Sequence, residues 1–117
     1  MTGRDQPTSV GVIGVGSMGQ NHARVYRELP ETRLEGIYDA DTQRAGEVAA
    51  AYGTEALDMD ALLETCEAVS IAVPTRYHYD VARECIDAGV AVLVEKPFVE
   101  SIENGHRLVE FADERDV

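Results

Sequence analysis

Lysine is nearly absent from this chain: nine of its 10 basic residues are arginine, and Lys96 is the single lysine. Against 22 acidic residues this leaves a net charge of −12, which disfavours nucleic acid or an anionic membrane as partner. An acidic, lysine-poor composition is typical of proteins that work at high salt, where screening weakens the repulsion between carboxylates. The composition therefore predicts a halophilic protein, with ordinary solubility as the simpler explanation.

Cysteine and long apolar runs are also scarce. The two cysteines, Cys66 and Cys85, match neither a CxxC pair nor the spacing of metal ligands, so no metal site is expected. Both fall in helical patterns, which predicts buried free thiols and fits a reducing cytoplasm. No stretch approaches the roughly 20 apolar residues of a membrane span, and no charged-then-apolar leader opens the chain. We therefore expect a cytoplasmic protein.

Apolar runs alternate with helical patterns along most of the 117 residues. Residues 1–8 are polar and predict a flexible N-terminal tail, whereas 9–117 are expected to form one domain. Strands are expected at 10–15, 34–38, 68–73 and 90–94, and helices at 18–29, 42–52, 79–88 and 102–114. Because the strands are apolar throughout, they predict a doubly wound α/β fold, with a parallel sheet covered by helices on both faces.

The helix expected at 18–29 has a stripe of larger side chains. Met18, His22, Val25 and Leu29 fall on one helical face, which predicts that this face packs on the sheet. For His22, on or beside that stripe, a structural role is favoured over a cofactor contact.

A glycine-rich turn follows the first expected strand. Gly14, Gly16 and Gly19 have the spacing G-x-G-x-x-G between a strand and a helix. In a dinucleotide-binding turn the first glycine allows the tight turn, the second lets a pyrophosphate approach the backbone, and the third lets the helix pack closely. The backbone N–H groups near Ser17 and Met18 would then face the phosphates, aided by the helix dipole.

Asp39 ends the second expected strand, 20 residues after Gly19. An acid at about this distance from the glycine turn hydrogen-bonds the hydroxyls of the adenosine ribose. A 2′-phosphate beside its carboxylate would be repelled, which predicts NAD rather than NADP as cofactor. Arg44 leaves NADP open, because its guanidinium could reach a 2′-phosphate.

Parallel strands end at the same edge of a sheet, where ligands bind in doubly wound folds. The glycine turn and Asp39 are expected at this edge together with two further segments, Val73–His78 and Glu95–Pro97. The sequence therefore predicts that four loops converge on one cleft.

Four segments together resemble one enzyme family. They are GVIGVGSMGQNHA at 11–23, IYDAD at 37–41, VSIAVPTRYHYDVA at 69–82 and AGVAVLVEKPF at 88–98. They resemble the N-terminal half of the Gfo/Idh/MocA oxidoreductases, which include glucose–fructose oxidoreductase and inositol dehydrogenase. The glycine motif is common to many dinucleotide enzymes, whereas Glu-Lys-Pro after the last strand is much more specific. The resemblance implies a Rossmann dinucleotide-binding domain.

The resemblance also implies a role for the single lysine. In that family the lysine of Glu-Lys-Pro lies near the nicotinamide and helps to bind or polarise the substrate hydroxyl. Carried over, this residue is Lys96, flanked by Glu95 and Pro97. A cation beside the reacting hydroxyl stabilises developing alkoxide charge, and a compact ammonium suits this task better than a guanidinium.

A second segment resembles the family's P-N-x-x-H loop, which lies beside the nicotinamide ribose. In this chain the loop follows Val73 and runs from Pro74 to His78, with Thr75 where asparagine is usual. A cofactor contact is therefore expected from this loop. For His78 a structural role at the start of a helix remains equally open.

The family's second, larger α/β domain has no counterpart in these 117 residues. That domain supplies the substrate pocket, further acid–base residues and most oligomer contacts. We therefore expect the cofactor-binding lobe of an NAD(P)-dependent oxidoreductase acting on a sugar, cyclitol or similar hydroxyl compound. Alone it should be inactive, and its exposed apolar surface would favour a homo-oligomer. The alternative is a stand-alone dinucleotide-binding or sensing module, which would not need Lys96.

Overall fold

The computed structural model describes residues 6–94 and 102–117, apart from the side chains of Ile102 and Asn104. Strands and helices alternate along the chain, as expected. In order they are β1 (Thr8–Ile13), α1 (Ser17–Glu28), β2 (Thr32–Tyr38), α2 (Thr42–Tyr52), α3 (Met59–Thr65), β3 (Ala68–Ile71), the 3₁₀ helix η2 (Thr75–Tyr77), α4 (His78–Asp87), β4 (Ala91–Val94) and α5 (Ile102–Arg115).

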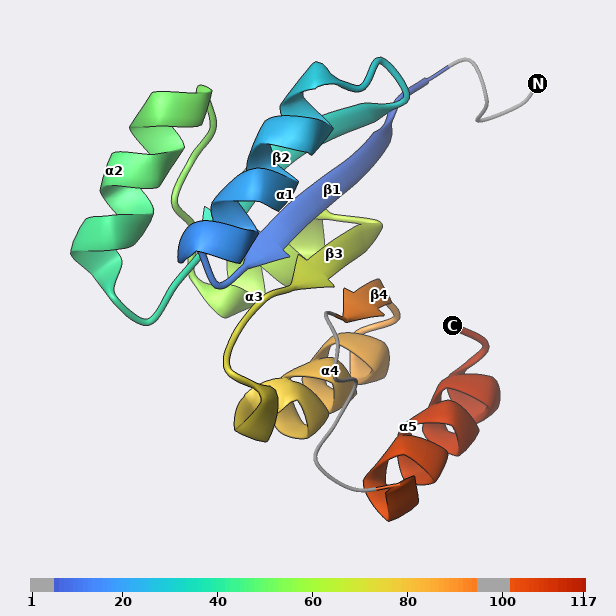
Figure 1. Cartoon of the computed structure of the whole chain (residues 1–117). Coiled ribbons are helices and arrows are strands. Elements are labelled where there is room, and N and C mark those ends of the chain that lie inside the picture. Colours follow the sequence, from blue (N-terminus) through green and yellow to red (C-terminus); the bar gives the residue numbers. More distant parts are fainter. Residues whose placement is uncertain (1–5, 95–101) are drawn as a thin grey trace.

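The four strands form one parallel sheet in the order β2-β1-β3-β4, with helices on both faces (Figure 1). Val12 of β1 faces α1 and α2, where it packs with Ala23, Ile37 and Val48. The next residue, Ile13, faces the opposite core under α3, α4 and α5. This alternation along one strand confirms the doubly wound α/β fold.

The ends of several elements follow from local side-chain chemistry. Asp41 and Asp58 cap α2 and α3 by accepting from the N–H groups of Arg44 (3.1 Å) and Ala61 (2.8 Å). Gly53 ends α2 with a φ of 68°, a conformation that favours glycine. β1 begins at Thr8, because the Thr8 N–H donates to the Glu31 carbonyl of the chain entering β2.

The expected packing face of α1 is wrong. The residues of α1 that are buried against the sheet are Gly19 and Ala23, whereas Met18, Val25 and Leu29 are exposed. The helix lies so close to the glycine turn that a Cβ on Gly19 would come 1.7 Å from the Gly14 carbonyl oxygen. Only small side chains fit at such a contact, so the larger apolar side chains point away from the sheet.

The burial expected for the last strand is also wrong. Val90 is buried, but Ala91 and Leu93 are exposed and Val92 and Val94 only half-buried. Among the described strands β4 pairs only with β3, which makes it an edge strand. An apolar run at an edge keeps its strand conformation without full burial. In the part of the chain that the structure describes, no helix is both long and apolar enough to cross a membrane.

Candidate functional site

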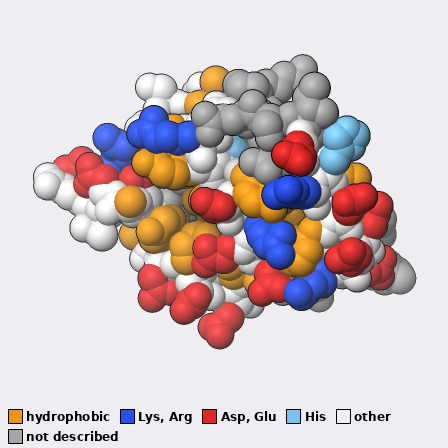
Figure 2. Space-filling view, turned by 90° about the horizontal axis from the view of Figure 1, so that it is seen from below, with side chains coloured by type: hydrophobic (Ala, Val, Ile, Leu, Met, Phe, Trp, Pro, Cys, Tyr) orange, Lys and Arg blue, Asp and Glu red, His pale blue; other side chains and the backbone are white. Residues whose placement is uncertain are grey.

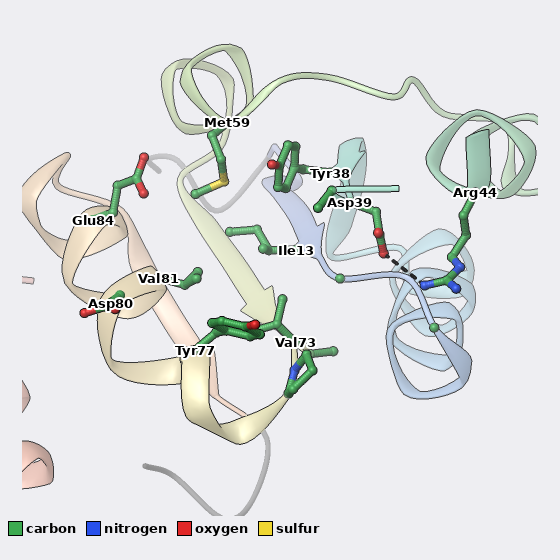
Figure 3. Close-up of a pocket in the computed structure, with 15 residues that line it drawn as sticks. Ile13, Tyr38, Asp39, Arg44, Met59, Val73, Tyr77, Asp80, Val81 and Glu84 are labelled. Carbon is green, nitrogen blue, oxygen red and sulfur yellow. Dashed lines mark ion pairs between the residues drawn. The ribbon is translucent and has the colours of Figure 1, made fainter. Parts of the chain in front are cut away.

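A cleft of about 700 Å³ lies at the carboxyl ends of β1, β2 and β3 (Figure 3). Its walls come from the glycine turn, the β2–α2 loop and the start of α2, the segment after β3 with η2, and the helices α3 and α4. The lining residues are Ile13, Gly14, Gly16, Tyr38, Asp39, Ala40, Arg44, Met59, Ala72, Val73, Pro74, Tyr77, Asp80, Val81 and Glu84. The structure therefore brings three of the four expected loops to one cavity.

The backbone of the glycine turn is left-handed at Gly14 and open to solvent at Gly16. Gly14 has a φ of +90°, and a Cβ there would lie 2.9 Å from backbone atoms of Ala72. A Cβ on Gly16 would meet nothing within 4 Å, so the backbone at this point borders open space. Gly16 is also the N-cap of α1; no side chain caps this terminus, and the first turn carries no acidic residue. The backbone N–H groups of the first turn of α1 therefore have no side-chain acceptor, and an anion such as a pyrophosphate fits against them.

Asp39 connects two loops of the cleft through its carboxylate. Oδ2 accepts from the Val15 N–H at 2.8 Å and Oδ1 accepts from the Asp41 N–H at 2.8 Å. The side chain is 12% exposed. The carboxylate therefore fixes the glycine turn against the β2–α2 loop while remaining on the cleft wall.

Arg44 stands at the rim of the cleft beside two acids. Its Nη1 lies 3.7 Å from Asp39 Oδ2, and its Nη2 lies 3.9 Å from Asp41 Oδ2. The side chain is 49% exposed, and Figure 3 shows it reaching back from α2 toward Asp39. A half-exposed arginine in this position partly neutralises the two carboxylates and can move without breaking the fold.

His78 takes a structural position. Its ring is buried, and Nε2 lies 2.7 Å from the Val73 carbonyl oxygen. Because a carbonyl oxygen only accepts, Nε2 carries the hydrogen and donates it. His78 does not line the cleft, but it fixes the main chain of Val73, which does. Thr75, the first residue of η2, does not line the cleft either.

The other expected site residues differ in position. Ser17 and Met18 are exposed at the start of α1 and do not line the cleft. The Met18 side chain instead borders a separate apolar groove with Val25 and Leu93. Gly19 is buried beneath the turn. The predictions for Glu95, Lys96 and Pro97 lie outside the described residues.

Sequence reasoning missed the side chains opposite the glycine turn. Tyr77, Val81 and Glu84 line the cleft from η2 and α4, and Tyr38 and Met59 line it from β2 and α3. The spacing of Tyr77, Val81 and Glu84 places them on one face of a helix, which was the available signal. Nothing in the sequence around Met59 indicated its place in the cleft, because that place depends on how α3 crosses the sheet.

The two cysteines lie away from the cleft, in the core under α3 and α4. Burial raises the pKa of both Cys66 and Cys85 to about 12, with smaller contributions from Glu35 and Glu84. They are therefore protonated, unreactive thiols at neutral pH. Within 6–94 and 102–117, no group of three or more His, Cys, Asp or Glu side chains could hold a metal ion.

The surface charge matches the composition. Figure 2, a view from below, shows exposed hydrophobic side chains flanked by acidic ones. Among residues 6–94 and 102–117, the charged residues that line the cleft are the acids Asp39, Asp80 and Glu84 and the arginine Arg44.

The Gfo/Idh/MocA oxidoreductase family, described by its NAD-binding Rossmann fold, matches residues 8–117. The chain belongs to this family. The match covers the glycine turn, Asp39 and the segment after β3, which all border the cleft of this Gfo/Idh/MocA domain.

Curated relatives of this Gfo/Idh/MocA domain are dehydrogenases. The UDP-N-acetylglucosamine 3-dehydrogenase of Acidithiobacillus ferrooxidans is 43% identical over 106 residues, which are 90% of this chain and 33% of that enzyme. The inositol 2-dehydrogenase of Rubrobacter xylanophilus is 37% identical over 114 residues, which are 94% of this chain and 33% of that enzyme. The chain therefore spans about a third of the length of these relatives.

Solved structures similar to this chain include complexes with either dinucleotide. GenD2 from gentamicin A biosynthesis, in complex with NAD, is 34% identical with a TM-score of 0.91, over 96% of this chain and 33% of its own. KijD10, a 3-ketoreductase from Actinomadura kijaniata in complex with TDP-benzene and NADP, is 28% identical with a TM-score of 0.88, over 96% and 37%. Membership of the family is therefore compatible with NAD and with NADP.

Proposed function

We propose that this Gfo/Idh/MocA domain is the cofactor-binding lobe of an NAD(P)-dependent dehydrogenase, and that it prefers NAD. The observation that carries the proposal is the Asp39 carboxylate, held on the cleft wall by the glycine turn itself. The open space at Gly16 and the uncapped start of α1 fit the pyrophosphate, and Asp39 fits the hydroxyls of the adenosine ribose.

The preference for NAD rests on charge. The Asp39 carboxylate would repel a 2′-phosphate, and Asp41 adds a second negative charge nearby. Arg44 is already paired with these two acids, so it would have to leave them to meet a phosphate. NADP is therefore the weaker ligand in this proposal.

The nicotinamide end of the site is assigned to the segment after β3 and to Lys96. When bound, the nicotinamide accepts or donates a hydride. Val73 and Pro74 would border it, and His78 and Thr75 would hold that segment in place. Lys96, carried over from the family motif, would bind the substrate hydroxyl and stabilise the negative charge that develops on its oxygen. Glu95 and Pro97 flank this lysine.

The substrate class follows from the relatives. One acts on a nucleotide sugar and another on inositol, so we propose a secondary hydroxyl of a sugar or cyclitol, oxidised to a ketone or formed from it. Oxidation would release a hydride to the cofactor and a proton to an acid–base group. This chain matches about a third of the length of these relatives. In the proposal, the substrate pocket and any homo-oligomer contacts are completed by residues that correspond to the other two thirds.

The working environment is part of the proposal. The net charge of −12 supports a protein adapted to high salt, and two buried free thiols support a reducing cytoplasm. The binding test should therefore be carried out in molar KCl and with the thiols kept reduced.

The test is a calorimetric titration of the chain with NAD and NADP. We expect NAD to bind at least ten times more tightly, and Asp39→Asn to narrow that ratio by removing the charge that repels the 2′-phosphate. Arg44→Gln should leave NAD binding within about twofold. Arg24→Gln is a matched control, because Arg24 is a similarly exposed arginine that pairs with Glu28 on α1.

Two results would contradict the proposal. Equal or tighter binding of NADP would make Arg44 the group that reads the ribose and would overturn the role given to Asp39. If the chain has native circular dichroism and binds neither dinucleotide, the proposal that this lobe alone binds the cofactor is wrong.

A further inference from the structure

The glycine turn contains two successive peptide units, Gly14–Val15 and Val15–Gly16, and the first is held from both sides. Its N–H, on Val15, donates to Asp39 Oδ2 at 2.8 Å. Because a peptide unit is planar and trans, the Gly14 carbonyl points the opposite way, toward α1. There a Cβ on Gly19 would come 1.7 Å from the Gly14 oxygen. The orientation of the first peptide unit is therefore fixed by Asp39 and by the close approach of α1.

A side chain of α1 contacts the second peptide unit. Gln20, the fourth residue of α1, donates from Nε2 to the Val15 carbonyl oxygen at 3.0 Å. That oxygen only accepts, so the NH₂ end of the Gln20 amide faces it. The main chain of Gln20 is fixed as well, because its N–H donates to the Gly16 carbonyl at 2.9 Å. The Gln20 side chain therefore reaches back from the first turn of α1 and holds the Val15 carbonyl.

The direction of the Val15 carbonyl determines where the Gly16 N–H points. In a planar trans peptide the C=O and the N–H point in opposite directions. Gln20, the partner of the carbonyl, does not line the cleft, whereas Gly16 does. With its carbonyl directed at Gln20, this peptide unit therefore directs the Gly16 N–H toward the cleft.

This orientation has little support from sterics. Gly16 has no Cβ to restrict its backbone dihedrals, and a Cβ placed there would meet nothing within 4 Å. A rotation of the Val15–Gly16 peptide unit would turn its carbonyl oxygen into the cleft and its N–H out of it. A phosphate would then face an acceptor instead of a donor. The hydrogen bond from Gln20 opposes that rotation.

We propose that Gln20 is a positioning residue of the pyrophosphate site: by holding the Val15 carbonyl, it keeps the Gly16 N–H directed at the phosphates. The inference rests on the proposed function, in which the glycine turn receives the pyrophosphate. Gln20 acts through the main chain and needs no contact with the ligand. Its contribution is preorganisation, because the donor is in place before the ligand binds.

ADP-ribose and adenosine are the probes that test this role. They share the base and the ribose that Asp39 is proposed to contact, and ADP-ribose adds the pyrophosphate and a second ribose. Titration followed by ¹H–¹⁵N NMR in molar KCl measures both, including dissociation constants in the millimolar range. The parent chain should bind ADP-ribose more tightly than adenosine by about tenfold or more, because phosphate oxygens accept strong hydrogen bonds from backbone N–H groups.

Gln20→Met removes the donor and keeps an unbranched side chain that favours a helix. Since one hydrogen bond corresponds to about fivefold in affinity, ADP-ribose should bind about fivefold more weakly, and adenosine within about twofold of the parent chain. Asn21→Met is the matched control, because it makes a similar exchange at the next, exposed position of α1 and should change neither constant. Circular dichroism should confirm that both variants fold.

The outcomes separate this inference from the proposed function. If Gln20→Met weakens both probes equally, Gln20 supports the fold and not the phosphate site, and the inference is wrong. If it weakens neither, the inference is wrong as well, and in both cases the proposed function stands. A parent chain that binds adenosine as tightly as ADP-ribose overturns the pyrophosphate site and leaves the role of Asp39. Binding of neither probe overturns the proposed function, and the inference with it.

Discussion

β1 and β4 are both short apolar strands of one parallel sheet, yet they differ in almost every structural respect. β1 pairs with β2 and β3 and is buried from Ser9 to its end, whereas β4 pairs with β3 among the described strands and alternates between exposed and half-buried residues. Their sequences, TSVGVI and AVLV, do not indicate which of the two strands is buried. An apolar run therefore predicts a strand, but the order of strands decides how much that strand contributes to the core.

The strongest test of this difference is a matched pair of truncations. Ile13 of β1 is 1% exposed and Leu93 of β4 is 55% exposed. Ile13→Ala should lower the free energy of unfolding by about 3 kcal/mol, because it removes buried methyl groups and leaves a cavity. Leu93→Ala should change it by less than about 0.5 kcal/mol. Urea unfolding measures both, and equal losses would show that Leu93 is covered in solution.

The thiols give a second test with a smaller expected effect. Cys66 lies against β1, and Cys85 lies on α4, which packs on β4. Burial raises the pKa of both to about 12, above the ordinary value of 9.0. A raised pKa leaves stability intact below pH 9, and that stability is then lost as the pH rises toward 12, because only the unfolded chain ionises there. At pH 10 the loss should be about 1 kcal/mol per thiol.

Single alanine variants assign the alkaline loss to each thiol. Cys66→Ala and Cys85→Ala should each reduce the fall in unfolding free energy between pH 8 and pH 10, measured by urea titration against the parent chain. If the edge strand opens more readily than the centre of the sheet, a thiol reagent at pH 8 will label Cys85 faster than Cys66. Equal labelling rates would show that both thiols become accessible only on global unfolding.

Salt should change the free energy of unfolding of the chain without changing the difference in stability loss between the β1 and β4 variants. With a net charge of −12, screening should raise the unfolding free energy between low salt and molar KCl. The gap between Ile13→Ala and Leu93→Ala should stay constant, because neither substitution alters charge. Replacing the exposed Glu64 and Glu110 by glutamine should reduce the salt dependence, and stability that is flat or falls in KCl would contradict the halophilic assignment.

The sequence was most informative where geometry depends on a few neighbouring atoms. The positions of Gly14, Gly16 and Asp39 follow from local requirements: a left-handed turn, an open backbone and an acid at a strand tip. The caps Asp41 and Asp58 were equally local. These features were predictable because they need no knowledge of how distant elements pack.

Features that depend on packing between elements were harder to predict. Periodicity selected the face of α1 with Met18 and Val25 as the packing face, because it rewards large apolar side chains. The close contact at Gly19 instead turns the face with Gly19 and Ala23 toward the sheet. Met59 and Tyr77 reach the cleft from elements placed by crossovers, so their roles became visible only in three dimensions. Lys96 remains a prediction from the family motif.

The double hydrogen bond of Asp39 has a consequence for protein engineering. Replacing the acid at the strand tip with a small neutral residue would remove the charge that opposes a 2′-phosphate. In this chain that exchange would also leave the N–H groups of Val15 and Asp41 without their acceptors, and so loosen the glycine turn, which we propose as the pyrophosphate site. A redesign of coenzyme preference should therefore keep an acceptor at position 39 and alter the charges around Arg44 instead.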